Sequence, residues 1–167
     1  VTRHGGEAII VDDKWGEPVD PQKVEDALKK NPGTKIVAFV HAETSTGVQS
    51  DAKTISEIAK RYNCLTIMDT VTSLGGTPIY IDGWGIDAVY SGSQKCLSCP
   101  PGLSPVSFSD RVVELVKNRK HKVQSWFMDI NLLLGYCGSS RTYHHTAPPN
   151  ALYGLHEALL MLYEESL

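Results

Sequence analysis

Residues 64–69 read Cys-Leu-Thr-Ile-Met-Asp, an apolar run that ends on a carboxylate, and residues 35–40 read Lys-Ile-Val-Ala-Phe-Val. Continuous apolar runs of this length are typical of strands that a parallel sheet buries on both faces. Between them, Asp51 can cap a helix. That helix has one apolar stripe, formed by Ala52, Ile55, Ile58, Ala59 and Tyr62. The order of strand, helix and strand predicts a β-α-β unit with parallel strands.

The same alternation continues on both sides of this unit. Upstream, residues 7–11 form a predicted strand, and Asp20 followed by Pro21 predicts a helix that ends at 31–33. Downstream, residues 86–90 and 104–109 are the third and fourth predicted strands. The link between them carries two prolines, Pro100 and Pro101, and no helical pattern. Since a parallel return needs a helix-length crossover, we expect the fourth strand to run antiparallel in an α/β fold with a mainly parallel sheet.

The last third of the chain reads as helical. A helix is expected over 110–119, a short apolar piece over 129–134, and a final helix from near Asn150. The apolar face assigned to that final helix consists of Leu152, Leu155, Leu159 and Tyr163. The chain starts at Val1 without an initiator Met, and the final helix still runs at Leu167. We therefore expect a piece of a larger domain, with part of its sheet left uncovered.

Length and composition narrow the class of protein. The chain has 167 residues, of which 41% are hydrophobic and 21% charged, values that exclude a disordered chain, a collagen and a long coiled coil. The net charge is -3, and neither half is strongly basic, which argues against nucleic acid and anionic membrane as partners. The densest basic cluster, Lys117, Arg119, Lys120 and Lys122, is interpreted as a solvated helix end. No apolar stretch is long enough for a membrane span.

Four cysteines suggest a reducing compartment rather than disulfides. Cys64 lies in an apolar run and is expected to be a buried small residue. Cys96 and Cys99 have the spacing of a redox or metal pair, but no partner ligands follow. The sequence after them, Pro-Pro-Gly at 100–102, predicts a loop rather than the helix start that a thioredoxin-like motif requires. A redox or metal site is therefore not favoured.

Three polar segments follow the predicted strands, and each begins where a strand ends. They are residues 41–47 (His-Ala-Glu-Thr-Ser-Thr-Gly), 69–76 and 91–95. In open α/β sheets ligands bind beyond the carboxyl ends of the strands, so these segments should converge on one cleft. Asp69 by itself could simply cap the following turn, and Lys95 by itself could be a surface lysine. Facing one cleft together, they suggest a carboxylate and a nucleophilic amine.

Three longer motifs resemble the class V aminotransferases, which are pyridoxal-phosphate (PLP) enzymes of fold type I. They are Asp-Thr-Val-Thr-Ser-Leu-Gly-Gly-Thr-Pro at 69–78, Tyr-Ser-Gly-Ser-Gln-Lys at 90–95 and Tyr-His-His-Thr at 143–146. The closest similarity is to the alanine–glyoxylate and serine–pyruvate aminotransferase family, over essentially the whole chain. The resemblance implies that residues 1–167 are the central part of the PLP-binding large domain. Its N-terminal part and the C-terminal small domain would be absent.

The resemblance also implies a role for five residues around the cofactor. Lys95 would form the Schiff base with PLP and then act as a base, and Asp69 would pair with the pyridine nitrogen. Val71 would pack against one face of the ring. Thr44 would lie near the phenolic oxygen, where the family often has Ser, and Gln94 would bind the phosphate. The residue that stacks on the ring and the arginine that grips the substrate carboxylate would lie outside the chain.

Tyr143 and Thr146 match residues that reach the phosphate of the neighbouring subunit's cofactor, which implies a homodimer. Bare spacing instead favours an ordinary polar turn before a helix. His144 and His145 receive no catalytic role from the resemblance.

The function implied is transfer of an amino group from alanine or serine to glyoxylate or pyruvate, in a peroxisome or a mitochondrion. Hydroxykynurenine transamination is an alternative that the sequence does not exclude. Cysteine desulfuration is disfavoured, because Ser93 and Gln94 precede the lysine where desulfurases carry a histidine. A third possibility is an inactive piece that only pairs with partners through exposed apolar surface.

Overall fold

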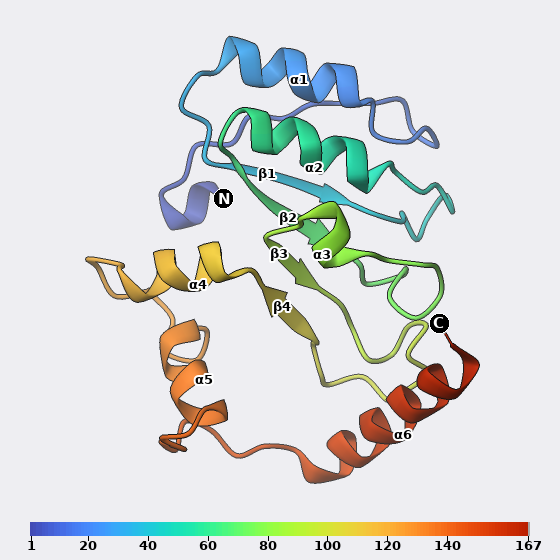
Figure 1. Ribbon diagram of the computed structural model, residues 1–167, viewed down its shortest axis with the longest axis vertical. Coiled ribbons are helices and arrows are strands. Elements are labelled where there is room, and N and C mark those ends of the chain that lie inside the picture. The colour runs from blue at the N-terminus through green and yellow to red at the C-terminus, as the bar shows by residue number, and fades with distance from the viewer. Residues whose placement is uncertain (167) are drawn as a thin grey trace.

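A computed structural model describes residues 1–166 and contains a four-stranded sheet in the order β1-β2-β3-β4 (Figure 1). The strands are β1 (Ile36–Val40), β2 (Leu65–Asp69), β3 (Ala88–Tyr90) and β4 (Val106–Phe108). The first three are parallel, and β4 pairs antiparallel with β3. This confirms both the β-α-β unit and the reversal expected from the short link before β4. The third strand is two residues shorter than predicted, because Ile86 donates its N–H to the Ile81 carbonyl and Asp87 donates its N–H to Thr66 Oγ1.

Three helices cover one face of this sheet: α1 (Pro21–Lys30), α2 (Ala52–Arg61) and α3 (Ile81–Trp84) (Figure 1). The side chains of Asp20 and Asp51 accept from Gln22 N–H and Thr54 N–H, so both predicted N-caps are confirmed. Beneath the helices lie two apolar clusters. One joins Val24, Leu28, Ile58, Ala59 and Cys64, and the other joins Ala52, Met68, Ile86 and Val89.

The opposite face of the sheet is open. Ile36, Val40, Tyr90 and Val106 lie on this face, where they are 48%, 37%, 41% and 56% exposed. The register places Val40, Asp69, Tyr90 and Val106 in one row across all four strands. Asp69 therefore lies within this row, between Val40 and Tyr90, at the carboxyl edge of the parallel strands. An uncovered part of the sheet was expected.

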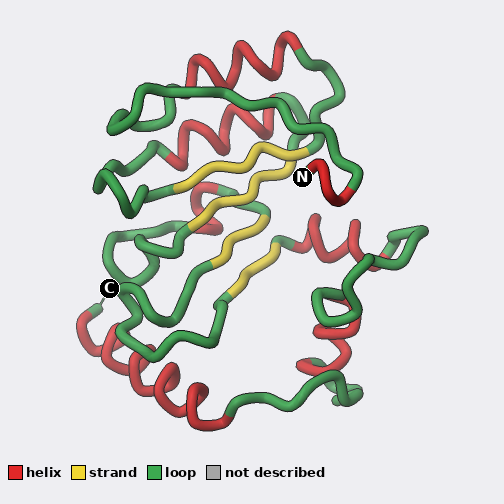
Figure 2. Tube along the Cα trace, turned by 180° about the vertical axis from the view of Figure 1, so that it is seen from behind, coloured by secondary structure: helices red, strands yellow, loops and turns green. Residues whose placement is uncertain are grey.

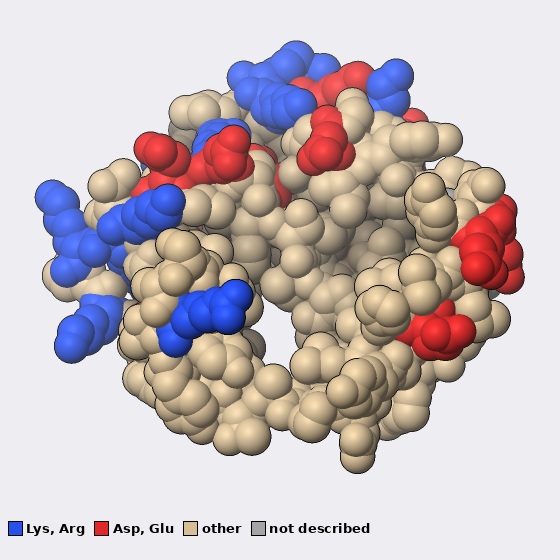
Figure 3. Space-filling model, turned by 60° about the horizontal axis from the view of Figure 1, so that its bottom comes forward, with Lys and Arg blue, Asp and Glu red and all other residues tan. Residues whose placement is uncertain are grey.

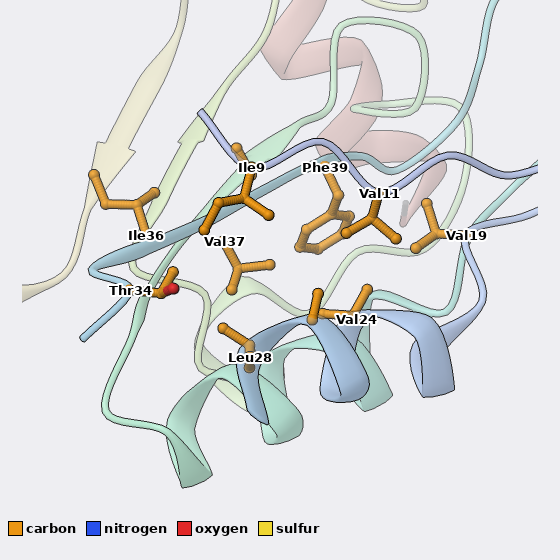
Figure 4. Close-up of a pocket in the computed structure, with 11 residues that line it drawn as sticks. Ile9, Val11, Val19, Val24, Leu28, Thr34, Ile36, Val37 and Phe39 are labelled. Atoms are coloured by element: carbon orange, nitrogen blue, oxygen red, sulfur yellow. The ribbon is translucent and has the colours of Figure 1, made fainter. Parts of the chain in front are cut away.

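The predicted strand at residues 7–11 is wrong. This segment is extended, but none of its backbone groups bonds to another strand within residues 1–166, and a strand exists only with a neighbour. Its side chains instead close an apolar cavity of about 190 Å³ against α1 and β1. Ile9 and Val11 come from the segment, and Val37, Phe39 and Leu28 from the other walls (Figure 4). A short 3-10 helix, η1 (Thr2–His4), precedes it.

The last third of the chain forms α4 (Asp110–Lys117), α5 (Ile130–Cys137) and α6 (Pro149–Glu165), and Leu167 lies outside the described residues. Figure 2 shows α6 at the end of the molecule opposite α1. Leu152, Leu155, Leu159 and Tyr163 share one face of α6, as predicted, but Leu152, Leu159 and Tyr163 are 44%, 51% and 83% exposed. The less exposed side consists of Ala151, Gly154, Leu155, Ala158 and Leu162. No helix within residues 1–166 combines the length and hydropathy that crossing a membrane requires.

Candidate active site

The three polar segments that follow β1, β2 and β3 do converge, and backbone hydrogen bonds join them. His41 N–H donates to the Asp69 carbonyl at 2.9 Å, and Thr70 N–H donates to the Tyr90 carbonyl at 2.9 Å. Ser91 Oγ donates to the Thr70 carbonyl at 3.1 Å. Consecutive strand ends are therefore fastened to each other in the order of the sheet. The expectation of one shared edge for these segments is confirmed.

Asp69 presents a carboxylate held at both oxygens. Its Oδ1 accepts from the N–H of Val71 at 2.8 Å, and its Oδ2 accepts from the hydroxyl of Tyr90 at 2.7 Å. The first bond caps the turn that follows Asp69, which was one of the two roles predicted for this residue. It also shows that the backbone of Val71 contacts Asp69. Each carboxylate oxygen has two acceptor positions, so the group retains capacity for a further donor.

Tyr90 contacts Asp69 directly, although the motif at 90–95 predicted no role for it. The register pairs Asp69 with Tyr90 on adjacent strands, so strand alignment would have placed the two side chains on one face. Donation to Asp69, together with partial burial, raises the pKa of the Tyr90 phenol to about 12. Tyr90 is thus a stable donor to the carboxylate at neutral pH.

His41 lies buried behind this edge, with 1% of its surface exposed. Its Nδ1 is 2.9 Å from Ser73 Oγ, its Nε2 is 3.0 Å from the amide nitrogen of Gln49, and its ring meets Trp84 edge-on at 5.6 Å. Because the amide nitrogen can only donate, Nε2 accepts and Nδ1 carries the proton. Burial lowers the pKa of His41, which agrees with a neutral ring. His41 therefore joins the loops after β1 and β2 as a structural element.

Lys95 lies in the loop between β3 and β4. Hydrogen bonds made by the buried residue Ser93 fix the backbone of this loop. Ser93 Oγ donates to the Pro100 carbonyl at 2.7 Å, and Cys99 N–H donates to the Ser93 carbonyl at 2.9 Å. Lys95 itself is exposed, and among the described residues no carboxylate or other acceptor pairs with its Nζ. The result is an accessible amine on a firmly held loop.

The loop that carries Lys95 also touches the loop that follows Asp69 and helix α6. Cys96 Sγ donates to the Thr72 carbonyl at 3.2 Å, and Cys99 Sγ donates to the Gly154 carbonyl in α6 at 3.4 Å. A Cβ on Gly76 would lie only 2.7 Å from Cys96 Sγ. The close approach of the two loops therefore depends on the absence of a side chain at position 76.

Thr44 and Gln94 are both exposed at this edge. Thr44 lies in a loop closed by the Glu43 N–H, which donates to the Val48 carbonyl at 2.8 Å. Gln94 folds back over its own loop, where a Cβ on Gly92 would lie 2.9 Å from Gln94 Oε1. Neither side chain has a hydrogen-bond partner within residues 1–166, so both polar ends can bind a ligand without breaking an existing bond.

Tyr143 and Thr146 lie on the segment between α5 and α6, apart from these loops. The Tyr143 hydroxyl is 2.9 Å from Thr146 Oγ1, so the structure brings this pair together. Within residues 1–166 no hydrogen bond connects either side chain to Asp69 or Lys95. The segment is a turn before a helix, as bare spacing suggested, but its middle residue His144 is 3% exposed.

The residues at this edge fit PLP in the chemistry of their donors and acceptors. A pyridinium N–H needs an anionic acceptor, and Asp69 offers one with acceptor capacity to spare. An aldehyde needs an amine that is not engaged in an ion pair, which describes Lys95. Figure 3 shows a face whose middle is hollowed and largely free of charged side chains, with Lys, Arg, Asp and Glu mostly around its rim.

Comparison with known proteins gives concordant results. The family model for class V aminotransferases matches residues 7–166. The chain is 44% identical to the alanine–glyoxylate aminotransferase of Oryctolagus cuniculus over 149 residues, which are 87% of the chain and 38% of that protein. A crystal structure of alanine–glyoxylate aminotransferase from Nostoc sp. superimposes with a TM-score of 0.93 at 44% identity, covering 98% of the chain and 43% of that protein.

A second solved structure, ureidoglycine–glyoxylate aminotransferase from Bacillus subtilis, has a TM-score of 0.95 at 36% identity, covering 99% of the chain and 43% of that protein. The chain spans about two fifths of the length of these relatives. Its α/β sheet with one reversed strand is that of the fold type I transferases, as expected. Family match, identity and superposition agree: the chain belongs to the class V aminotransferases.

Proposed function

We propose that the full-length protein is a PLP-dependent aminotransferase that moves the amino group of alanine, or of serine, to glyoxylate or pyruvate. The observation that carries the proposal is the placement of Asp69 at the end of β2 and of Lys95 in the loop that follows the adjacent parallel strand, β3. Relatives named alanine–glyoxylate aminotransferase, at 44% identity, support the choice of substrates. Residues 1–167 would form the central part of the PLP-binding large domain.

Each site residue then has a defined task. PLP, when bound, supplies an electrophilic carbonyl carbon and a ring that accepts the electron pair released at the substrate α-carbon. Asp69 would hold the proton on the pyridine nitrogen, while the Tyr90 hydroxyl and the Val71 N–H keep the carboxylate in place. The Val71 side chain would bound one face of the ring. Thr44 would donate near the phenolic oxygen, and Gln94 near the phosphate.

Lys95 Nζ would hold the cofactor covalently, and its free amine would serve as the base that moves the α-proton of the amino acid. The exposed amine, unpaired among the described residues, is suited to both tasks. The loop bonds of Ser93 and Cys99 keep it in place during the transfer.

We also propose that the protein acts as a homodimer in which Tyr143 and Thr146 bind the phosphate of the neighbouring subunit's cofactor. Their separation from the Lys95 loop supports this, because the hydroxyl pair then has no ligand in its own subunit. A location in a peroxisome or a mitochondrion rests on the family resemblance alone.

The superposition on the ureidoglycine–glyoxylate enzyme, with its TM-score of 0.95, favours ureidoglycine as a second candidate donor. Glyoxylate as the acceptor is common to both relatives.

The test begins with the full-length protein and PLP, treated with borohydride and digested for mass spectrometry. We expect a pyridoxyl group on the peptide that contains Lys95 and none in Lys95→Ala. Lys60→Ala, at an exposed lysine of α2, is the matched control and should keep the adduct. An adduct on another lysine would contradict the assignment. Turnover with alanine, serine, ureidoglycine or hydroxykynurenine as donor, each with glyoxylate or pyruvate, then decides the substrate pair.

A further inference from the structure

The two histidines between Tyr143 and Thr146 form a pair for which the proposed function has no use. His144 is 3% exposed, although Tyr143 beside it is 72% exposed. Its ring stacks on Trp126 with centroids 4.1 Å apart and planes 20° from parallel. A polar ring buried on a segment that is otherwise exposed needs partners for both of its nitrogens.

Those partners fix the protons of both rings. His144 Nε2 is 3.2 Å from the carbonyl oxygen of Trp126, which can only accept, so Nε2 carries a hydrogen. In the neutral ring Nδ1 is then an acceptor. It lies 2.9 Å from His145 Nδ1, which must therefore carry the hydrogen and donate it. The order of donation runs from His145 to His144 to the backbone before α5.

This chain of contacts flanks the two hydroxyls. The ring of Tyr136, in α5, lies 5.0 Å from His145 and meets the Tyr143 ring edge-on at 6.3 Å. Tyr143 in turn is 2.9 Å from Thr146 through their hydroxyl oxygens. The exposed pair is thus carried by a segment whose two middle residues are bonded to each other and, through His144, to the backbone at Trp126.

We propose that His144 and His145 are positioning residues, which hold the Tyr143 and Thr146 hydroxyls at the spacing needed to bind the phosphate of the cofactor. The inference deepens the proposed function and rests on it, since that function assigns the phosphate to this hydroxyl pair. A phosphate monoester is bound by donors held in a fixed arrangement, and the histidine pair supplies the fixing rather than the contact.

The experiment compares the affinity of the full-length protein for PLP and for pyridoxal, which lacks the phosphate, by absorbance titration. His145→Leu removes the donor at Nδ1, whereas His145→Asn carries an amide N–H close to the same place. We expect His145→Leu to weaken PLP binding roughly 2- to 10-fold, the equivalent of one ordinary hydrogen bond, and to leave pyridoxal binding unchanged. His145→Asn should recover most of the loss.

Two further variants make the result decisive. His144→Leu removes both the acceptor for His145 and the donor toward the Trp126 carbonyl, so it should show the same selective loss even if His145→Leu does not fold. His121→Leu, at an exposed histidine, should change neither affinity.

Equal weakening of PLP and pyridoxal in the folded variants, or no recovery in His145→Asn, would overturn the positioning role. Failure of the unaltered protein to bind PLP at all would overturn the proposed function together with the inference that rests on it.

Discussion

Asp69 and Tyr90 are direct register partners on adjacent parallel strands, and the Tyr90 hydroxyl donates to Asp69 Oδ2 across 2.7 Å. The carboxylate at the centre of the site is therefore oriented by the next strand of the sheet. A parallel ladder fixes that neighbour as firmly as it fixes the backbone. The bond has consequences for both activity and stability.

Tyr90→Phe keeps the ring and removes the donor to Asp69. The carboxylate retains only the Val71 N–H, so its orientation toward a pyridine nitrogen becomes less defined. We expect kcat/KM for alanine and glyoxylate to fall roughly 10- to 150-fold, the loss that corresponds to one hydrogen bond to a charged group. Steady-state kinetics of the full-length protein measures this. Tyr80→Phe, at a tyrosine that is 62% exposed, is the control and should keep the rate.

The same bond predicts a loss of stability in alkali. The pKa of Tyr90 is raised from 10.0 to about 12 in the folded chain, so unfolded molecules release this proton first as the pH rises. The stabilisation is complete below about pH 10 and is lost as the pH rises toward about 12. Urea unfolding of the full-length protein across this range should show a steeper decline than in Tyr90→Phe. Parallel declines would contradict the assignment.

His41 predicts the opposite trend in acid. Burial lowers its pKa from the ordinary value of 6.5, so unfolded molecules take up a proton before folded ones as the pH falls. Its contribution to stability is present above about pH 6.5 and is lost below that pH. His41→Gln should be less stable at about pH 8, since it loses the bond to Ser73 or to Gln49, yet decline less steeply toward about pH 5. Urea midpoints at several pH values test this, with exposed His156→Gln as the control.

Asp87 is the buried carboxylate that holds β2, β3 and the start of α4 together. Its Oδ2 accepts from Thr66 N–H at 3.0 Å and its Oδ1 accepts from Ser109 Oγ at 3.0 Å, with Arg111 at 3.8 Å from Oδ2. Asp87→Asn replaces one acceptor by a donor that faces another donor. We expect a loss of about 2–4 kcal/mol in the free energy of unfolding. Asp82→Asn, on an exposed turn, should change it by less than about 0.5 kcal/mol.

Gly76 predicts a steric effect on the lysine loop. A Cβ at this position would lie 2.7 Å from Cys96 Sγ and 3.2 Å from Cys96 Cβ, so Gly76→Ala must push the loop that carries Lys95. We expect roughly 10-fold slower turnover, since small displacements at a reacting centre are costly. Gly76→Ala combined with Cys96→Gly removes the clash and should restore most of the rate. Gly83→Ala, where the nearest atom is 3.4 Å away, should leave the rate unchanged.

Sequence reasoning succeeded where local chemistry decides structure. The caps at Asp20 and Asp51, the strands around Val37 and Met68 and the reversal of β4 follow from side-chain type, periodicity and link length. The convergence of the polar segments 41–47, 69–76 and 91–95 at one edge of the sheet followed from the rule for parallel sheets.

Sequence reasoning failed where contact with a residue distant in the sequence determines the structure. Residues 7–11 have a strand pattern, but their backbone meets no partner strand within residues 1–166. The packed face of α6 is set by contact with two loops, and no apolar periodicity reports that. A Cβ built on Gly75, in the loop after Asp69, would lie 3.2 Å from Leu162, and Cys99 Sγ in the lysine loop donates to the Gly154 carbonyl. Tyr90 and His144 were missed for the same reason. The importance of each depends on a residue distant in sequence, Asp69 and Trp126.

The reversal of β4 determines how the loop that carries Lys95 is anchored. Because β4 returns beside β3, and Ser91 and Ser93 N–H continue the pairing with the Pro105 and Leu103 carbonyls, the lysine sits on a hairpin closed at its base. No crossover helix has to be repositioned when the tip of that hairpin mutates. The position of the loop that carries Lys95 is therefore set by pairing within the sheet rather than by the packing of a crossover helix.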